Sequence, residues 1–508
     1  MNIKILSLNK LILLFIFFVF ISCSSSEDPD LPSPGPPNSE KCEPLSNLSI
    51  DEITGTSAVI SWANDRVNTT VEIEYGPNGF ELGSGTIKFS NTNSILLDDL
   101  TINTDYQFYT RVNCGTQSSE HSTAYEFTTT CDLGMHQGWV ILQTQKDVED
   151  FGNLCYTGID GTLRLNGFES SDPIVDLSSL SHLTKITGAV EILDNKELEN
   201  LNGLEGLQSV FGIVLWGNSK LISIKGLQNI EEITGATATR NGGDTEPGVI
   251  IRNNQKLESL EGLEKITVVG QLSIRNNSSL KALNGLTNLN TVLDGVLIGG
   301  NSTLIDLSGL NSLTSVQTDF LIGGNDNLTN LNGLQQLKTV QGELGIGGNV
   351  GLVSLKGIEV VEKAGIIRIS GNTSLTSLKW LNINQADHIL YIQKNNSMTR
   401  IDGIEGTSSS CYLIIEDNDN LKSLNGMENI TELNGLDVLK NDNLNSLAGI
   451  DNIVSITSDI RFAYNPLLSN FCNLTNLANN GFIGGVLSTY DNLYNPELAD
   501  IQNGNCSQ

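Results

Sequence analysis

The side chains that most often carry out catalysis or bind metals are few in this sequence and widely scattered. The four histidines, His121, His136, His182 and His388, stand far apart, and no Cys-x-x-Cys pair occurs, so no spacing typical of a zinc site is present. Acidic residues outnumber basic ones by 58 to 28. General acid–base catalysis, however, needs carboxylates that are held together at one substrate. We therefore expect no catalytic residues, no metal site and no cofactor.

Charge and composition exclude further classes of function. The net charge of −30 would repel the phosphates of DNA and RNA, so we expect no nucleic acid partner. Hydrophobic residues make up 39% of the 508 residues, which is enough for a folded core. The acidic run at 416–420 leaves calcium binding open as an alternative.

Beyond residue 160 the chain repeats itself with a period of 23 or 24 residues, broken by one gap of 36. The repeat is marked by Asn195, Asn218, Asn254, Asn277, Asn301, Asn325, Asn349, Asn372, Asn395, Asn418, Asn441 and Asn465. Apolar residues alternate before each Asn, which predicts a short parallel strand, and leucines follow it at intervals that predict a turn back to the core. Successive repeats should therefore stack as coils, and the asparagines should form a ladder that bonds backbone groups.

The repeat pattern G-x-L-x-I-x-x-N-x-x-L-x-x-L-x-G-L resembles leucine-rich repeats and, more closely, the receptor L domain family of insulin- and EGF-receptor ectodomains. The resemblance implies a parallel β-solenoid that recognises a ligand or a protein. We expect about 13 coils over 161–470. An N-terminal cap at 132–160 and a C-terminal cap at 471–508, where the period is abandoned, should close the two ends. In the first cap Thr144 precedes Asp147 by three residues, which predicts a helix start.

The segment from 42 to 131 alternates short β-rich runs with turn residues, which predicts a small two-sheet sandwich. The runs are 57–62, 71–76, 94–100, 105–114 and 125–130. Trp62 stands where a buried Trp would lie between the sheets, and Tyr106 is placed for a tyrosine corner. The segment resembles a fibronectin type III domain, which implies a spacer or protein-contact module. The expected fold class is therefore mainly β, with this sandwich followed by the solenoid at 132–508.

The first 41 residues are typical of a lipoprotein leader and tether. Two lysines precede an apolar run at 11–21, and the following Phe-Ile-Ser-Cys resembles the cleavage site of a bacterial lipoprotein. We expect residues 1–22 to be a signal peptide and Cys23 to be lipidated, so that the chain contacts the outer membrane through lipid alone. Residues 23–41, rich in proline, should form an extended tether. Acidic residues after Cys23 resemble the surface-export signal of some Gram-negative lipoproteins, which favours the cell exterior over the periplasmic leaflet.

The remaining seven cysteines would lie in an oxidising compartment. We expect the disulfides Cys42–Cys114, Cys131–Cys155 and Cys472–Cys506. The first would join the start of the sandwich to the end of its 105–114 strand, and the other two would staple the caps of the solenoid. Cys411 is left over and should be a small buried hydrophobic residue.

The exposed face of the solenoid strands is the predicted ligand-binding surface, because residues two and four positions before each ladder Asn should point outward. An apolar island with neighbouring arginines lies there, followed by leucines beside three Ile-Gly-Gly-Asn coils. The candidate ligand-binding residues are Val214, Trp216, Ile250, Arg252, Arg275, Leu297, Leu321 and Tyr391. Alternatively, these side chains pack on a neighbouring loop or on the sandwich. The 236–248 loop inserted by the long gap is either a further binding element or a tolerated surface excursion.

These features favour a lipid-anchored cell-surface recognition or adhesion protein that binds an extracellular protein or glycan and is not an enzyme. Two other functions stay open: a polysaccharide-active β-helix enzyme and a passive structural spacer of the envelope. An enzyme would need clustered acids on the strand face, whereas Glu191 and Asp437 lie about ten coils apart.

Overall fold

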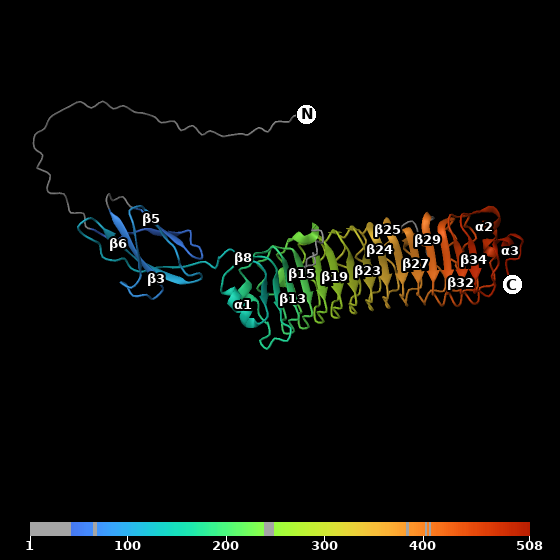
Figure 1. Ribbon diagram of the computed structural model, residues 1–508, viewed down its shortest axis with the longest axis horizontal. Coiled ribbons are helices and arrows are strands. Elements are labelled where there is room, and N and C mark those ends of the chain that lie inside the picture. The colour runs from blue at the N-terminus through green and yellow to red at the C-terminus, as the bar shows by residue number, and fades with distance from the viewer. Residues whose placement is uncertain (1–41, 64–68, 238–247, 383–385, 402–403, 406–407) are drawn as a thin grey trace, which may run out of the picture.

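The computed structural model describes residues 42–63, 69–237, 248–382, 386–401, 404–405 and 408–508. Within these ranges a β-sandwich is followed by a long parallel β-solenoid (Figure 1). The predicted signal peptide, Cys23 and the tether lie outside the described residues. In the part of the chain that is described, no helix is long and apolar enough to cross a membrane.

The sandwich consists of two antiparallel sheets packed around a core that includes Trp62. One sheet has the order β1-β2-β5 and the other β4-β3-β6-β7. The strands are β1 (Leu48–Asp51), β2 (Ala58–Trp62), β3 (Thr70–Pro77), β4 (Thr86–Ser90), β5 (Ser94–Leu97), β6 (Asp105–Asn113) and β7 (Tyr125–Thr128). The Tyr106 hydroxyl accepts a hydrogen bond from the Thr101 amide at 2.9 Å, which confirms the tyrosine corner. The sequence pattern did not reveal β1 or β4; in β4 the apolar Ile87 and Phe89 are both exposed, so the strand lacks a buried alternation.

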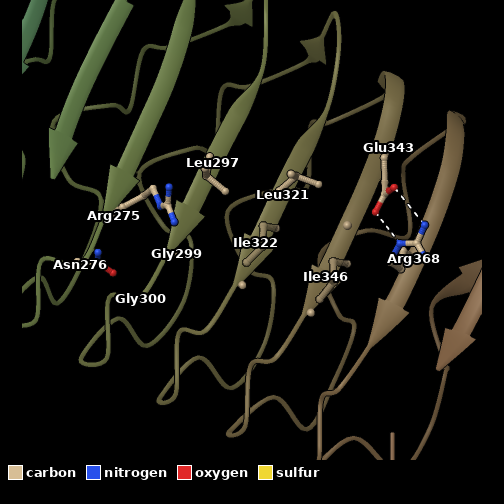
Figure 2. Close-up of a pocket in the computed structure, with 13 residues that line it drawn as sticks. Arg275, Asn276, Leu297, Gly299, Gly300, Leu321, Ile322, Glu343, Ile346 and Arg368 are labelled. Atoms are coloured by element: carbon tan, nitrogen blue, oxygen red, sulfur yellow. Dashed lines mark hydrogen bonds and ion pairs between the residues drawn. The ribbon is translucent and has the colours of Figure 1, made fainter. Parts of the chain in front are cut away.

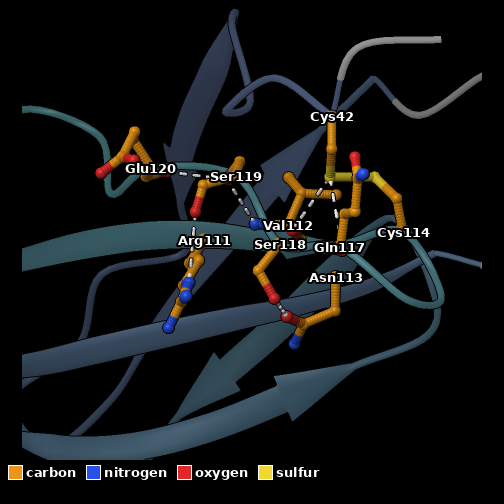
Figure 3. Close-up of a disulfide and its surroundings, with 9 residues drawn as sticks. All are labelled: Cys42, Arg111, Val112, Asn113, Cys114, Gln117, Ser118, Ser119 and Glu120. Atoms are coloured by element: carbon orange, nitrogen blue, oxygen red, sulfur yellow. Dashed lines mark hydrogen bonds between the residues drawn. A yellow bond between two sulfur atoms is a disulfide. The ribbon is translucent and has the colours of Figure 1, made fainter. Parts of the chain in front are cut away.

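The disulfides predicted from the sequence are confirmed. They are Cys42–Cys114, Cys131–Cys155 and Cys472–Cys506. The first joins the chain entering the sandwich to the end of β6 (Figure 3). The second ties the end of the sandwich to the first coil, and the third closes the C-terminal cap. Cys411 is buried without a disulfide partner, and burial raises the pKa of its thiol to about 12, so this thiol stays protonated and unreactive at neutral pH.

The solenoid is built around one long parallel sheet to which each coil contributes a strand. These strands are β9 (Val140–Leu142), β11 (Leu163–Asn166), β13 (Ala189–Leu193), β15 (Gly212–Trp216), β17 (Gly248–Arg252), β19 (Gln271–Arg275), β21 (Val296–Gly299), β23 (Phe320–Gly323), β24 (Thr339–Gly347), β25 (Lys363–Ser370), β27 (Ala386–Gln393), β29 (Ser408–Glu416), β30 (Glu432–Leu439), β32 (Ile460–Ala463) and β34 (Leu487–Tyr490). The solenoid has about 14 turns, close to the 13 coils expected. The strands β11 to β32 correspond to the expected coils, and each cap adds one strand, β9 and β34.

A second, narrower set of parallel strands runs along another side of the coils. It comprises β8 (Met135–Gln137), β10 (Gly158–Asp160), β12 (Lys185–Ile186), β14 (Ser209–Val210), β16 (Glu232–Ile233), β18 (Val268–Val269), β20 (Thr291–Val292), β22 (Ser315–Val316), β31 (Ser455–Ile456) and β33 (Phe482–Ile483), with β26 (Leu381–Asn382) pairing separately with β28 (Ile404–Glu405). From β24 to β30 the two strands of a coil merge into one strand of 8 or 9 residues. The leucines and isoleucines between the sheets are almost fully buried and form one continuous core.

The predicted asparagine ladder is present and runs along the whole core. From Asn195 to Asn465, each backbone N–H donates to the Oδ1 of the next ladder Asn at 3.0–3.1 Å. Each Nδ2 also donates to a strand carbonyl of the preceding coil; for Asn325 this is the Ile298 carbonyl at 3.0 Å. These side chains are almost completely buried, so each amide satisfies backbone groups that water cannot reach.

The N-terminal cap begins as predicted. Helix α1 (Gln145–Gly152) starts after Thr144, whose hydroxyl accepts a hydrogen bond from the Asp147 amide at 3.0 Å. The Asp147 carboxylate accepts in return from the Thr144 amide, and this hydrogen bonding helps to lower the pKa of that carboxyl. Helix α1 buries Val148 and Phe151 against the first coils.

The C-terminal cap contains one coil more than the sequence predicts. Asn465 donates to Asn492, whose amide in turn donates to the Asn495 Oδ1 at 3.0 Å, so the ladder ends there rather than at Asn465. The period of 23 or 24 residues is abandoned after 471, as expected, but the expected end of the coils at 470 is wrong, because one more coil follows. The spacing from Asn465 to Asn492 is 27 residues, because helix α2 (Thr475–Asn480) lengthens this coil, and a period of 23 or 24 misses it. Helix α3 (Leu498–Gln502) then packs on α2.

We predict that Asn325→Ala lowers the free energy of unfolding by about 2–5 kcal/mol, because it leaves the Asn301 amide and the Ile298 carbonyl buried without their partner. Urea unfolding followed by circular dichroism measures this change. The exposed Asn327→Ala in the same turn is the matched control and should change stability by less than about 0.5 kcal/mol. Equal effects of the two substitutions would contradict a structural role for the ladder.

Candidate ligand-binding face

The parallel pairing places the predicted outward residues in two straight columns along the long sheet. The column four residues before each Asn passes through Arg164, Glu191, Val214, Ile250, Ser273, Leu297, Leu321, Gly345, Arg368, Tyr391, Ile414, Asp437 and Arg461. The predicted register is therefore correct. The candidate residues nevertheless do not form one site, because they fall into two hollows and a separate aromatic contact.

The first hollow holds Val214, Trp216, Ile250 and Arg252. It has a volume of about 170 Å³ and is also lined by Arg164, Glu191 and Leu193. Trp216 is 48% exposed, as predicted, but Ile250 is only 2% exposed and forms the floor instead of an exposed island. Its neighbour Ser273 on the next strand is also fully buried, so the face is covered at this point, which a count of strand positions does not show.

Charged groups close one side of this first hollow. The Glu191 carboxylate is buried and pairs with the Arg164 guanidinium at 2.5 Å, and that guanidinium lies 5.2 Å from the centre of the Trp139 ring. On the other side the Arg252 Nε donates to the Ser273 hydroxyl at 3.1 Å. Most of the inserted loop, residues 238–247, lies outside the described residues, so its predicted role at this hollow is not tested.

The second hollow owes its shape to three coils in which two glycines precede the ladder Asn. The second glycines, at 300, 324 and 348, have φ of 67–69°, a left-handed conformation shared by the residue before every ladder Asn. The first glycines, at 299, 323 and 347, have no such requirement. Trp216 and Arg275 occupy the same register in other coils, so this register can carry a side chain. A Cβ added at Gly299 or Gly323 would, however, come within 2.9 Å of the carbonyl oxygen of the next coil, so glycine here also fits a close approach of the backbones.

These missing side chains leave a hollow that we call the glycine groove. It has a volume of about 270 Å³ and is lined by Arg275, Asn276, Leu297, Gly299, Gly300, Leu321, Ile322, Gly323, Glu343, Gly345, Ile346, Gly347 and Arg368. Figure 2 shows Leu297 and Leu321 projecting from adjacent strands between Arg275 on one side and Glu343 with Arg368 on the other. The Leu321 side chain leans over Gly345, where an added Cβ would come within 2.7 Å of it.

The two arginines that flank the glycine groove differ in their electrostatic state. Arg368 donates to Glu343 at 2.8 Å, which raises the pKa of the guanidinium, and its guanidinium stacks 4.0 Å from the centre of the Tyr391 ring. Tyr391 therefore lies outside the groove with one ring face already covered. Arg275 is exposed, and no ion pair or hydrogen bond of its side chain is found within the described ranges. The groove thus combines apolar walls with one uncompensated positive charge.

Toward the C-terminal end the strand face becomes polar. The Tyr412 hydroxyl donates to the Asp437 carboxylate at 3.0 Å, and the Arg461 guanidinium lies 3.8 Å from the same carboxylate. Burial, reinforced by the Asp437 charge, raises the pKa of Tyr412 to about 12, and burial also raises the pKa of the Asp437 carboxyl. Among the described residues no group of three or more His, Cys, Asp and Glu side chains is placed to hold a metal ion.

Sequence reasoning missed Glu343 and Arg368 as members of the groove. Arg368 lies in an outward column but was not singled out, and Glu343 stands six residues before Asn349, outside both columns considered. The signal was available in the glycine at 345, which removes the side chain that would otherwise separate Leu321 from Glu343.

We predict that Tyr412 ionises with a midpoint near its pKa of about 12, measurable as the difference in tyrosinate absorbance between the protein and its Tyr412→Phe variant. Because the folded-state pKa lies above the unfolded one, stability from this group is present at lower pH and is lost as pH rises from about 10 through 12. Asp437→Asn removes a nearby negative charge and should lower the midpoint. A midpoint near 10 that Asp437→Asn leaves unchanged would contradict the described contact.

The comparisons with known proteins concern both parts of the chain. No match is found among curated proteins. Among solved structures, the chain is similar to a myokine structure (23% identity, 18% of this chain, 97% of the other, TM-score 0.15), to the chicken CNTN1 FN1-FN3 domains (14%, 17%, 31%, TM-score 0.16) and to a computer-based redesign of a β-sandwich protein (25%, 17%, 90%, TM-score 0.16). Residues 155–257 and 184–289 match the family model of the receptor L domain. The first part of the solenoid, over residues 155–289, is thus a receptor L domain region.

Proposed function

We propose that this protein is a lipid-anchored cell-surface recognition protein that binds an extracellular protein or glycan through the glycine groove. In this proposal Cys23 carries the lipid, residues 23–41 form the tether, and the sandwich is a fibronectin type III spacer. The solenoid then presents its strand face to the ligand, outside the outer membrane.

The glycine groove is the observation that carries the proposal. Leu297 and Leu321 point out of the long sheet and remain partly exposed, whereas the leucines that point into the solenoid core are buried. Three successive first glycines keep the space beside these leucines open, and they also fit the close approach of the next coil. Apolar walls with a few placed polar groups are typical of binding sites, and a charge such as that of Arg275 can orient a ligand.

The carboxylates give less support to a polysaccharide-active enzyme. Glycosidases need two carboxyl groups roughly 5–10 Å apart, one as acid and one as base or nucleophile. On the described strand face Glu343 is paired with Arg368, and Glu191 with Arg164. Asp437 accepts a hydrogen bond from Tyr412. Each of these acids is held by a partner from its own sheet and is poorly placed to attack or protonate a substrate.

We predict that the double variant Leu297→Asn, Leu321→Asn loses binding by about tenfold or more while its melting temperature stays within a few degrees. Binding of the purified full-length protein is measured on a printed array of extracellular proteins and glycans. Ile305→Asn and Val353→Asn form the matched control, because both are exposed apolar residues on the turn side of the solenoid. Unchanged binding in the groove variant, or an equal loss in the control, would contradict the proposal.

We predict that protease added to intact cells removes the solenoid signal on an immunoblot, because the proposal places the solenoid outside the outer membrane. A periplasmic protein probed on the same blot controls for cell integrity. Cys23→Ser should release the chain from the membrane fraction, because it removes the acylated side chain. Protection of the solenoid until the cells are lysed would exclude the cell-surface location.

A further inference from the structure

The C-terminal end of the long sheet is an open edge. Strand β34 pairs with β32, and among the described strands none lies on its other side. The Ile460 amide donates to the Val486 carbonyl at 3.0 Å, and the Tyr464 amide donates to the Tyr490 carbonyl at 3.2 Å. Because backbone groups alternate in direction along a strand, the N–H and C=O groups between these positions, those of residues 487 and 489, point away from β32.

This edge is also the least covered part of the solenoid core. Each residue from 481 to 490 is at least partly exposed, whereas most of β32 is buried. Exposed apolar side chains surround the edge: Phe482 is 57%, Val486 63% and Leu493 62% exposed. Leu487, which occupies a core position, is only partly buried. The cap therefore leaves apolar surface and unpaired backbone groups side by side.

The edge lacks the features that normally prevent sheets from pairing. Exposed edge strands are usually protected by lysine or other charges, by proline or by a bulge. Residues 481–490, Gly-Phe-Ile-Gly-Gly-Val-Leu-Ser-Thr-Tyr, contain no charged residue and no proline. In a chain of net charge −30, such a segment is a surface that two copies can bring together with little repulsion.

We propose that β34 pairs with β34 of a second copy of this chain, antiparallel about a two-fold axis at Ser488. In this register Leu487 lies opposite Thr489 of the second copy, and both residues have their backbone groups directed outward. The two symmetric pairs form four N–H···O=C bonds without disturbing the pairing with β32. Phe482, Val486 and Leu493 lie around this contact and are buried with it.

The rest of the molecule favours a second copy over other partners and limits the assembly to two chains. A two-fold interface needs a surface that is complementary to itself. The β34 edge has this property, because it is uncharged and its outward N–H and C=O groups, those of residues 487 and 489, lie symmetrically about Ser488. At the opposite end of the solenoid the sandwich precedes the first coil (Figure 1), and Cys131–Cys155 ties the two together. Because the two-fold contact uses the β34 edge of both copies, this pairing is closed at two chains.

Sedimentation velocity of the purified full-length protein, at concentrations from roughly 1 to 200 μM, tests this proposal. We expect a species of twice the mass of the monomer that dissociates on dilution. Val486→Lys places a charge on the edge and should raise the dissociation constant by at least tenfold. Val353→Lys, at an exposed valine on the turn side, is the matched control and should leave it unchanged.

Hydrogen exchange locates the contact independently of mass. The amides of Leu487 and Thr489 should exchange slowly in the dimer and rapidly in Val486→Lys, while exchange at the Asn ladder stays the same in both. A wild-type protein that is monomeric over the whole range would overturn the proposal. A dimer that persists in Val486→Lys, or a dimer in which the amides of 487 and 489 exchange fast, would show that the contact is not at β34. A different protein bound at this edge would also overturn the proposal.

Discussion

The buried asparagine ladder is the interaction on which the rest of the structure depends. A coil of 23 or 24 residues must turn sharply out of its strand, and the turn leaves backbone groups directed into the core. One amide side chain per coil satisfies these groups and bonds the next coil in the same step. Satisfying these buried groups requires an Asn at one position of each coil and, before it, a residue in the left-handed backbone conformation. Neighbouring coils therefore stay in register over the length of the rod.

Because the ladder and the inner leucines hold the fold, the outward positions of the long sheet are free to vary. The chain uses this freedom unevenly along the solenoid. Near the N-terminal end, Trp216 lines a hollow whose floor is Ile250. In the middle, the glycine groove extends from Arg275 past Leu297 and Leu321 to Arg368. Beyond Arg368 the face is a network of hydrogen bonds and ion pairs. A repeated scaffold with a locally varied surface suits recognition better than it suits a passive spacer.

The sequence predicted the repeated features well and the irregular ones poorly. The ladder, the strand register and the tyrosine corner each follow from a local rule applied to a fixed spacing, and the structure confirms them. The disulfides follow from the place of the cysteines in the predicted sandwich and caps, and they are confirmed as well. Ile250 was misjudged because its place in an outward column does not determine whether other parts of the chain cover it. Asn492 was missed because helix α2 lengthens the last coil. The role of Glu343 was missed because Glu343 reaches Leu321 only where Gly345 has no side chain between them.

The central claim is that recognition resides on the strand face and is concentrated at the glycine groove. The most direct test is a scan in which exposed positions on the strand face and on the turn sides are replaced one at a time, and each variant is scored separately for folding and for binding. The account predicts folded variants that lose binding at Arg275, Leu297 and Leu321, with neutral substitutions on the turn sides. Binding losses that cluster on the turn sides or on the sandwich, with the groove tolerant of change, would contradict it.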